Sequence, residues 1–356
     1  MKNRLVDTFI ELVAIDSPTG REDEFAKHMS DRLVKLGLNV TADSYGNLVA
    51  RKDGSGEPVF FAAHMDTVEP GRGIKATVKG GYLVSDGRTI LGADNKAAIA
   101  AMLEFLAETS ESQIKTLPVD IILTRSEEIG NYGAVNLDIS LLRAGKGYCF
   151  DSSNPVGTIV TASPIYERFD LVLNGKDAHA SVPEQGINTL TVLQKLLTKF
   201  ALGRLDDMSV INIGIVHAGS VRNTVPGAMT LAGELRSFRE KELDQHKKRF
   251  TRMVEKVCYR MGATYTIDWV RENPGYRHTE GAGRAFVTET AAVISAAGLK
   301  PKQLRSWGVS DANIFNDRGL LCINLADGSE FSHSTEERQS VRELRRLVTV
   351  MRSLAT

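Results

Sequence analysis

The chain has 356 residues, of which 42% are hydrophobic and 25% are charged, and its 44 Lys and Arg residues balance 44 Asp and Glu residues. This length predicts about two domains, and zero net charge gives no indication of a nucleic-acid partner or an anionic membrane surface. No apolar run approaches the roughly 18 residues that a membrane-spanning helix needs, so we expect no membrane partner.

The first part of the chain alternates helices and strands. An amphipathic helix is expected at the amino terminus, and a second one runs from Thr19 to about Leu36, where Thr19 and Glu22 are spaced like a capping box. Later segments read as strands at 39–51, 58–68, 117–124 and 147–151, with a hairpin region up to residue 91 and a helix at 95–109. This alternation predicts an α/β domain with a mostly parallel mixed sheet flanked by helices.

The pattern changes at about residue 161. Half-exposed strands and two amphipathic helices follow, which is typical of a smaller α+β unit, and the α/β pattern returns after residue 274. We therefore predict one α/β domain built from residues 1–160 and 275–356, interrupted by an inserted domain at 161–274. The cysteines Cys149, Cys258 and Cys322 are far apart and mostly in apolar surroundings, which predicts reduced core residues in a cytoplasmic protein.

Two polar residues stand at the end of an apolar strand in the stretch FFAAHMDTV. Residues two apart on a strand face the same side, so His64 and Asp66 project together. The histidine can bind a metal ion, and the aspartate can hold the imidazole ring in place. For a single pair, a buried histidine satisfied by a neighbouring aspartate is the simpler interpretation.

Other segments repeat this arrangement. Asp94 precedes a helix, Glu127 and Glu128 follow one strand, and Asp151 ends another. Taken singly, these residues are also explained by a helix cap, a solvated loop and a turn. Binding sites in open α/β sheets form beyond the carboxyl ends of the strands. Because several polar residues follow strand ends here, we expect them to belong to one functional site. His333, in a loop after a later strand, is a further candidate, although such a histidine alone is commonly a surface residue.

The chain resembles the co-catalytic dizinc peptidase and deacylase family that includes peptidase T, glutamate carboxypeptidase and aminoacylase. The matching motifs occur in the family's order along nearly the whole chain: HMDT, GADNKAA, EEIG, CFDSS, DAHAS, RNTVPG, GELRSF, WGVSDAN and SHSTEE. The sequences of these motifs are most similar to those of the tripeptidase-like, or peptidase T-like, branch. The resemblance implies that the α/β domain is catalytic and that the inserted domain is a lid.

The resemblance also implies a ligand set for two zinc ions per subunit, with cobalt or manganese as substitutes. In this set His64 and Asp151 bind one ion, Glu128 and His333 bind the other, and Asp94 bridges both. Histidine nitrogen and carboxylate oxygen are ligands that zinc takes, and a catalytic zinc site keeps one position open for water.

The same resemblance assigns two further residues to catalysis. Asp66 is implied to orient His64, and Glu127 to act as the general base toward a water molecule activated by the two zinc ions. Neighbouring residues such as Glu127 and Glu128 tend to point apart, so one can bind metal while the other accepts a proton. The family also implies a cis peptide bond between Asp94 and Asn95.

Three residues of the inserted domain match substrate-binding positions of the family. The resemblance implies that His179 stabilises the tetrahedral oxyanion, in dimeric members sometimes from the other subunit, and that Asn223 and Arg236 contact substrate. Arg236 suits bidentate contact with a carboxylate. A loop histidine and an arginine on a solvated strand face are the simpler interpretations, and the sequence leaves open whether the protein is a homodimer.

We therefore expect a metal-dependent exopeptidase acting on short peptides, an aminopeptidase of tripeptidase type. The alternatives are a carboxypeptidase or a deacylase of N-acyl amino acids from the same family, and a catalytically silent binding protein that has kept the fold. The complete set of implied ligands together with Glu127 argues against the silent protein. No G-x-S-x-G elbow and no P-loop occur in the chain, which disfavours a serine hydrolase and a nucleotide enzyme.

Overall fold

The computed structural model describes residues 3–356, which form two compact units. The larger unit contains the chain up to Ala162 together with Arg277–Ser306 and Ser310–Thr356. The smaller unit contains Ser163–Tyr276 and the short segment Trp307–Val309. The chain therefore leaves the larger unit twice, once for a long insertion and once for three residues. That the smaller unit acts as a lid stays a prediction.

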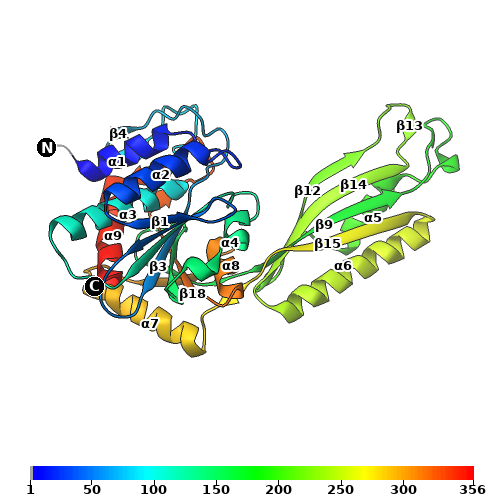
Figure 1. The fold of residues 1–356 in the computed structure, drawn as a ribbon. Coiled ribbons are helices and arrows are strands. Elements are labelled where there is room, and N and C mark those ends of the chain that lie inside the picture. The colour runs from blue at the N-terminus through cyan, green and yellow to red at the C-terminus, as the bar shows by residue number, and fades with distance from the viewer. Residues whose placement is uncertain (1–2) are drawn as a thin grey trace. The chain divides into compact units, whose positions relative to one another are not determined.

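The larger unit is built on a nine-stranded mixed sheet (Figure 1). Strands β6, β3, β7 and β18 are parallel neighbours, whereas β1, β2 and β8 pair in antiparallel fashion. The full order is β1-β2-β6-β3-β7-β18-β8-β16, with β17 also pairing with β8. This mixed sheet with a parallel centre confirms the predicted α/β fold.

The bounds of these strands are β1 Asn39–Ala42, β2 Leu48–Lys52, β3 Val59–His64, β6 Val119–Thr124, β7 Lys146–Phe150, β8 Thr158–Ser163, β16 Tyr276–Arg277, β17 Lys302–Arg305 and β18 Leu321–Leu325. A second, four-stranded sheet of the larger unit has the order β19-β20-β5-β4. Its strands are β4 Thr77–Lys79, β5 Tyr82–Val84, β19 Ser329–Glu330 and β20 Arg338–Ser340. It joins the segment before residue 91 to the segment that contains His333.

Helices cover both faces of the large sheet. On one face Phe61 of β3 packs in a core with α1, α2, α3, α7 and α9. On the other face Phe60 makes an edge contact with Phe315 of α8, with ring centroids 5.7 Å apart. Because helices shield both sides, β3 is buried along its whole length and can consist almost entirely of apolar residues. The helices are α1 Arg4–Ala14, α2 Asp23–Lys35, α3 Ala93–Glu111, α4 Tyr132–Asn136, α7 Gly281–Ala296, α8 Asp311–Asp317 and α9 Val341–Leu354, with a 3₁₀ turn at Ile139–Leu141.

The start of α2 differs from the sequence prediction. The helix begins at Asp23 after Glu22, with no side-chain cap, so the predicted capping box is wrong. The Thr19 hydroxyl instead donates to Asp66, and the Glu22 carboxylate accepts hydrogen bonds from Arg125 and Ser126. Both side chains form hydrogen bonds with distant segments. These contacts replace the local capping interaction.

The smaller unit is a five-stranded antiparallel sheet covered by two helices (Figure 1). Burial alternates along β9, and its inward residue Phe169 packs against Phe250 of α6 in a core that α5 also joins. This is the predicted α+β pattern, with the sheet order β11-β12-β14-β9-β15. The bounds are β9 Ile165–Asn174, β10 Ala178–His179, β11 Gly203–Asp206, β12 Ser209–Ala218, β13 Thr224–Val225, β14 Ala228–Ser237, β15 Thr264–Asn273, α5 Thr189–Lys199, α6 Glu240–Met261 and a 3₁₀ turn at Pro183–Gln185.

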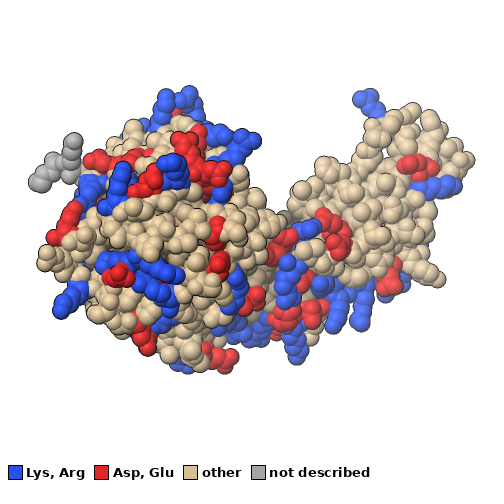
Figure 2. Space-filling model, in the orientation of Figure 1, with Lys and Arg blue, Asp and Glu red and all other residues tan. Residues whose placement is uncertain are grey.

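Charges of both signs are interspersed on the surface. Figure 2 shows acidic and basic side chains near one another on the face in view, and the chain has equal numbers of each. Among residues 3–356, no helix has both the length and the apolar composition that crossing a membrane requires.

Candidate metal centre

Three neighbouring parallel strands deliver polar residues to one edge of the large sheet. His64 is the last residue of β3, Asp151 directly follows β7, and Glu127 lies in the loop after β6. The register pairs His64 with Thr124, the last residue of β6, so the strand ends are level. The carboxyl ends of parallel strands form an edge that is open to ligands.

Asp94 lies between the two histidines. Its Oδ1 is 3.0 Å from Nε2 of His64, and its Oδ2 is 3.5 Å from Nε2 of His333. His333 also lies 3.0 Å from Oε1 of Glu128. Two atoms bound to one tetrahedral zinc ion at about 2.1 Å are about 3.4 Å apart. One oxygen of Asp94 is therefore suitably placed for each of two ions.

Three overlapping groups of side chains bring their ligand atoms within 4.8 Å of one another. The groups are His64, Asp94 and Asp151; Asp94, Glu128 and His333; and His64, Glu127 and Glu128. The first two correspond to the two ligand sets that the resemblance implies, and Asp94 is the residue they share. The structure thus brings together all seven predicted residues of the larger unit, since Asp66 contacts this cluster as well. The peptide bond between Asp94 and Asn95 is cis, as the resemblance implies.

The cluster holds more negative charge than the protein neutralises. Burial and the charge of Asp94 raise the pKa of Asp151 well above its usual range. Burial and the neighbouring Asp151 likewise raise the pKa of Glu127. Burial also acts to raise the pKa of Asp94, but hydrogen bonds with His333 and His64 lower it overall. A divalent cation would supply the missing positive charge.

The pKa values of the two histidines are raised as well. Hydrogen bonds to Asp94 and Glu128 raise the pKa of His333 to about 10. Burial lowers the pKa of His64, but its hydrogen bonds to Asp66 and Asp94 raise it well above its usual value. Without a cation, protonated imidazoles therefore provide the positive charge. Metal ions bind neutral histidine and displace such protons, so the donor set fits metal binding.

Asp66 has a broader role than the one inferred from its spacing to His64. The His64 ring places Nδ1 2.9 Å from the backbone carbonyl oxygen of Asp66 and 3.4 Å from its carboxylate. A carbonyl oxygen only accepts hydrogen bonds, so Nδ1 of His64 carries a hydrogen. Nε2 then faces the other candidate metal ligands and can itself bind a metal ion. The Asp66 carboxylate itself accepts the backbone N–H groups of Glu127 and Glu128, at 3.0 and 3.2 Å. It thereby fixes the turn that presents both glutamates.

Sequence reasoning singled out no role for Glu337, Asp311 or Asp327, although the same signal marks them. Glu337 is buried and accepts the backbone N–H groups of residues 91, 92 and 94 at 2.7 to 3.0 Å, so it holds the loop that carries Asp94. Asp327 follows β18, and burial together with the charge of Asp94 raises its pKa to about 8. Asp311 begins α8 and is bonded to Asn131. Asp327 is a carboxylate near a strand end, and Asp311 and Glu337 lie in the motifs WGVSDAN and SHSTEE.

Two candidate residues of the smaller unit, His179 and Asn223, are exposed, and the third, Arg236, is half-buried. The β10–β13 pairing places His179 opposite Thr224, and the Ala180 N–H donates to the Asn223 carbonyl oxygen at 2.9 Å. His179 and Asn223 are thus neighbours at one end of the unit. Nδ1 of the His179 ring lies 2.7 Å from the hydroxyl of Ser181 and accepts the backbone N–H of Ser181 at 3.2 Å.

Arg236 lies at the opposite end of β14 from these two residues. Its register partner is Tyr166 at the start of β9, and its guanidinium lies over that ring at 4.6 Å. The guanidinium donates to both carboxylate oxygens of Glu234, at 3.1 and 3.0 Å, and to the Trp307 carbonyl oxygen at 2.9 Å. A substrate carboxylate would therefore compete with Glu234 for this arginine.

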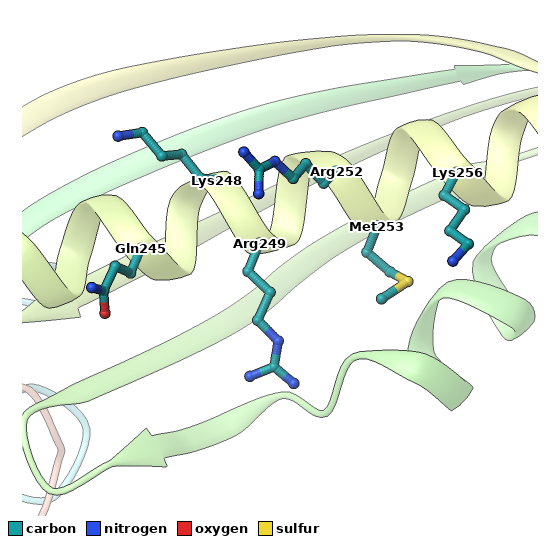
Figure 3. Close-up of a pocket in the computed structure, with 6 residues that line it drawn as sticks. All are labelled: Gln245, Lys248, Arg249, Arg252, Met253 and Lys256. Atoms are coloured by element: carbon teal, nitrogen blue, oxygen red, sulfur yellow. The ribbon is translucent and has the colours of Figure 1, made fainter.

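A hollow of about 480 Å³ lies along α6 in the smaller unit (Figure 3). Its lining residues are Gln245, Lys248, Arg249, Arg252, Met253 and Lys256. None of these six is a carboxylate, histidine or cysteine, so the hollow lacks the donor atoms of a metal site. The chemistry gathers at the edge of the large sheet instead.

The chain is similar to known proteins along nearly its whole length. Residues 60–356 match the model of peptidase family M20/M25/M40. The uncharacterized protein YqjE of Bacillus subtilis is 35% identical over 355 residues, covering 96% of this chain and 95% of the relative.

Two solved structures have the same fold at 34% identity. They are aminopeptidase PepT from Bacillus cereus, with a TM-score of 0.92, and a tripeptidase from Staphylococcus aureus, with a TM-score of 0.95. Each covers 99% of this chain and 97% of its own. The chain belongs to peptidase family M20/M25/M40, and it is a metallopeptidase.

Proposed function

We propose that this metallopeptidase is an aminopeptidase of short peptides, with tripeptides as its main substrates, and that it works with two zinc ions per subunit. The observation that carries the proposal is the position of Asp94, which faces His64 with one oxygen and His333 with the other. A carboxylate shared in this way suits a pair of ions. The two solved relatives at 34% identity, an aminopeptidase and a tripeptidase, support the choice of substrate.

We assign His64 and Asp151 to one ion, Glu128 and His333 to the other, and Asp94 to both. The donor set supports this assignment, since it combines imidazole nitrogens with an excess of partly buried carboxylates. When bound, the zinc pair would polarise the scissile carbonyl and lower the pKa of water, and cobalt or manganese would substitute for it.

We assign Glu127 as the general base. Burial raises the pKa of its carboxylate, and a general base works best when its pKa lies close to the working pH. Glu127 would take a proton from the attacking water and later deliver it to the leaving amine. Asp66 would keep the base in place, because its carboxylate accepts the backbone N–H of Glu127.

We assign substrate contacts to the smaller unit. His179 would donate to the oxyanion, Asn223 would hydrogen-bond the peptide backbone, and Arg236 would contact a carboxylate. The exposure of His179 and Asn223 supports these roles, because both side chains are open to a ligand. A cytoplasmic location and a homodimeric state stay predictions.

The substrate class is tested with one tripeptide in three forms. The free peptide, its N-acetylated form and its C-terminal amide are each incubated with zinc-loaded enzyme, and products are measured by mass spectrometry. We expect release of the first residue from the free peptide and from the amide, and no cleavage of the N-acetylated form.

Other outcomes assign the protein differently. Loss of cleavage with only the C-terminal amide would indicate a carboxypeptidase, and removal of the acetyl group would indicate a deacylase. Metal analysis of the same samples separates mechanism from specificity: about two zinc ions per chain are expected from a two-metal hydrolase. A fully loaded enzyme that cleaves none of the three forms would contradict the proposed substrate class without affecting the metal assignment.

A further inference from the structure

Asn131 connects two carboxylates in the larger unit. Its side-chain nitrogen Nδ2 lies 2.7 Å from Oε1 of Glu127 and 3.0 Å from Oδ1 of Asp311. Both Asn131, at 1% exposure, and Asp311, at 2%, are buried. An amide nitrogen carries two hydrogens, so it can donate one to each carboxylate.

The two carboxylates determine which end of the amide points toward them. An ionised carboxylate only accepts hydrogen bonds, so the amide oxygen of Asn131 could not satisfy either group. Asp311 is itself held by the hydroxyl of Thr124, the last residue of β6. The orientation of the Asn131 amide is therefore set by the rigid edge of the sheet.

The backbone of Asn131 adds a second contact to the same glutamate. Its N–H donates to the Glu127 carbonyl oxygen at 2.8 Å. The residue adopts a left-handed conformation with φ of 57°, which asparagine and glycine accept more readily than most residues. Asn131 thus holds Glu127 by main chain and side chain together.

We propose that Asn131 is a positioning residue for the carboxylate of Glu127. By occupying Oε1, its amide fixes the plane of the carboxylate and leaves Oε2 as the oxygen that meets the attacking water. Asp311 acts through Asn131 by keeping the NH₂ end directed at the base. This inference rests on the proposed role of Glu127 as general base.

The test uses Asn131→Gly, because glycine keeps the left-handed backbone and removes only the amide. We expect kcat to fall about 10- to 100-fold, the usual cost of losing a supporting hydrogen bond at a metal site. KM and zinc content should stay at the wild-type values. Asn136→Gly is the matched control on α4: that exposed amide donates to the Tyr132 carbonyl oxygen, and its loss should leave kcat unchanged.

A double-mutant cycle with Glu127→Gln separates positioning from a general structural effect. If Asn131 acts through the base, Asn131→Gly should change the residual rate of Glu127→Gln by less than about twofold, because coupled residues are not additive. An equal loss of kcat in both backgrounds would overturn the inference, and so would loss of zinc from Asn131→Gly. If Glu127→Gln itself keeps the wild-type kcat, the proposed base role fails as well, and that result is read from the single variant alone.

Discussion

The candidate residues of the larger unit form a cluster held by several distant segments, whereas His179 and Asn223 of the smaller unit are exposed. His64 is 2% exposed and contacts Asp66 and Asp94. His179 is exposed, and its ring nitrogen Nδ1 bonds the hydroxyl of Ser181, two residues further along. His64 is therefore held in one orientation before a ligand binds, whereas His179 can change its orientation when a ligand binds.

This difference predicts two kinds of failure. Removing a residue of the metal cluster should cost metal and activity together, because each side chain there is assigned to an ion or contacts a side chain that is. Removing an exposed residue of the smaller unit should change only the handling of substrate.

Asp94→Asn should be the most damaging change. The bridging assignment gives this carboxylate to both ions, so the variant should bind less than one zinc ion per chain. Activity should fall at least about a thousand-fold, since a metal ion supplies several kcal/mol of transition-state stabilisation. Zinc content by mass spectrometry and kcat/KM measure the two losses. Asp31→Asn, on the exposed surface of α2, is the control and should keep both. Full zinc loading of Asp94→Asn would contradict the bridging role.

His179→Gln should separate catalysis from metal binding. If His179 donates to the oxyanion, kcat should fall about 10²- to 10³-fold, as for the loss of one oxyanion donor. Zinc content and thermal stability should be unchanged, because the side chain is exposed. His217→Gln, an exposed histidine of the same unit on β12, should behave like wild type. Equal damage by both substitutions would mean that the effect is not specific to His179.

Arg236→Lys should have a smaller effect that depends on the substrate. If Arg236 binds the substrate carboxylate, loss of the bidentate contact should raise KM up to about tenfold for a free tripeptide and leave the C-terminal amide unaffected. An equal change in KM with both substrates would contradict this role and would mean that the guanidinium stays paired with Glu234. Arg168→Lys, at another ion-paired arginine of the same sheet, is the control.

The smallest effect concerns stability against pH in the metal-free protein. The pKa of Glu337 is raised to about 7, mainly by burial, and that of Asp327 to about 8, while His333 reaches about 10. All three values exceed those of an unfolded chain, so the folded state binds more protons between pH 5 and 9. The free energy of unfolding should therefore fall as pH rises through this range.

Calorimetry of the metal-free protein should show this as a decrease in the unfolding midpoint of roughly 5 °C between pH 5.5 and 8.5. Zinc should remove most of the decrease, because the ions replace the protons as positive charge. A midpoint that rises with pH in the metal-free protein would show that the cluster is not the group of excess carboxylates inferred from its burial.

Much of the fold follows from short-range patterns. The apolar run before His64 predicts a strand buried on both faces, and the alternation along β9 predicts one that is half exposed. The spacing of His64 and Asp66 predicts that they face the same side, and the motifs predict the residues that gather at the edge. These properties depend on the periodicity of strands and helices, which is written in consecutive residues.

The contacts that hold the site depend on segments far apart in the sequence. Glu337 accepts hydrogen bonds from the loop of Asp94, Thr19 donates to Asp66 instead of capping α2, and Arg236 donates to the carbonyl oxygen of Trp307. No local pattern specifies these partners, because a carboxylate, a hydroxyl or a guanidinium satisfies any suitable group that folding brings near it. Local patterns are enough to specify the strands, the helices and the types of ligand at the strand ends. Which oxygen faces which nitrogen depends on the folded chain, since burial and packing select one partner among several of equal chemistry.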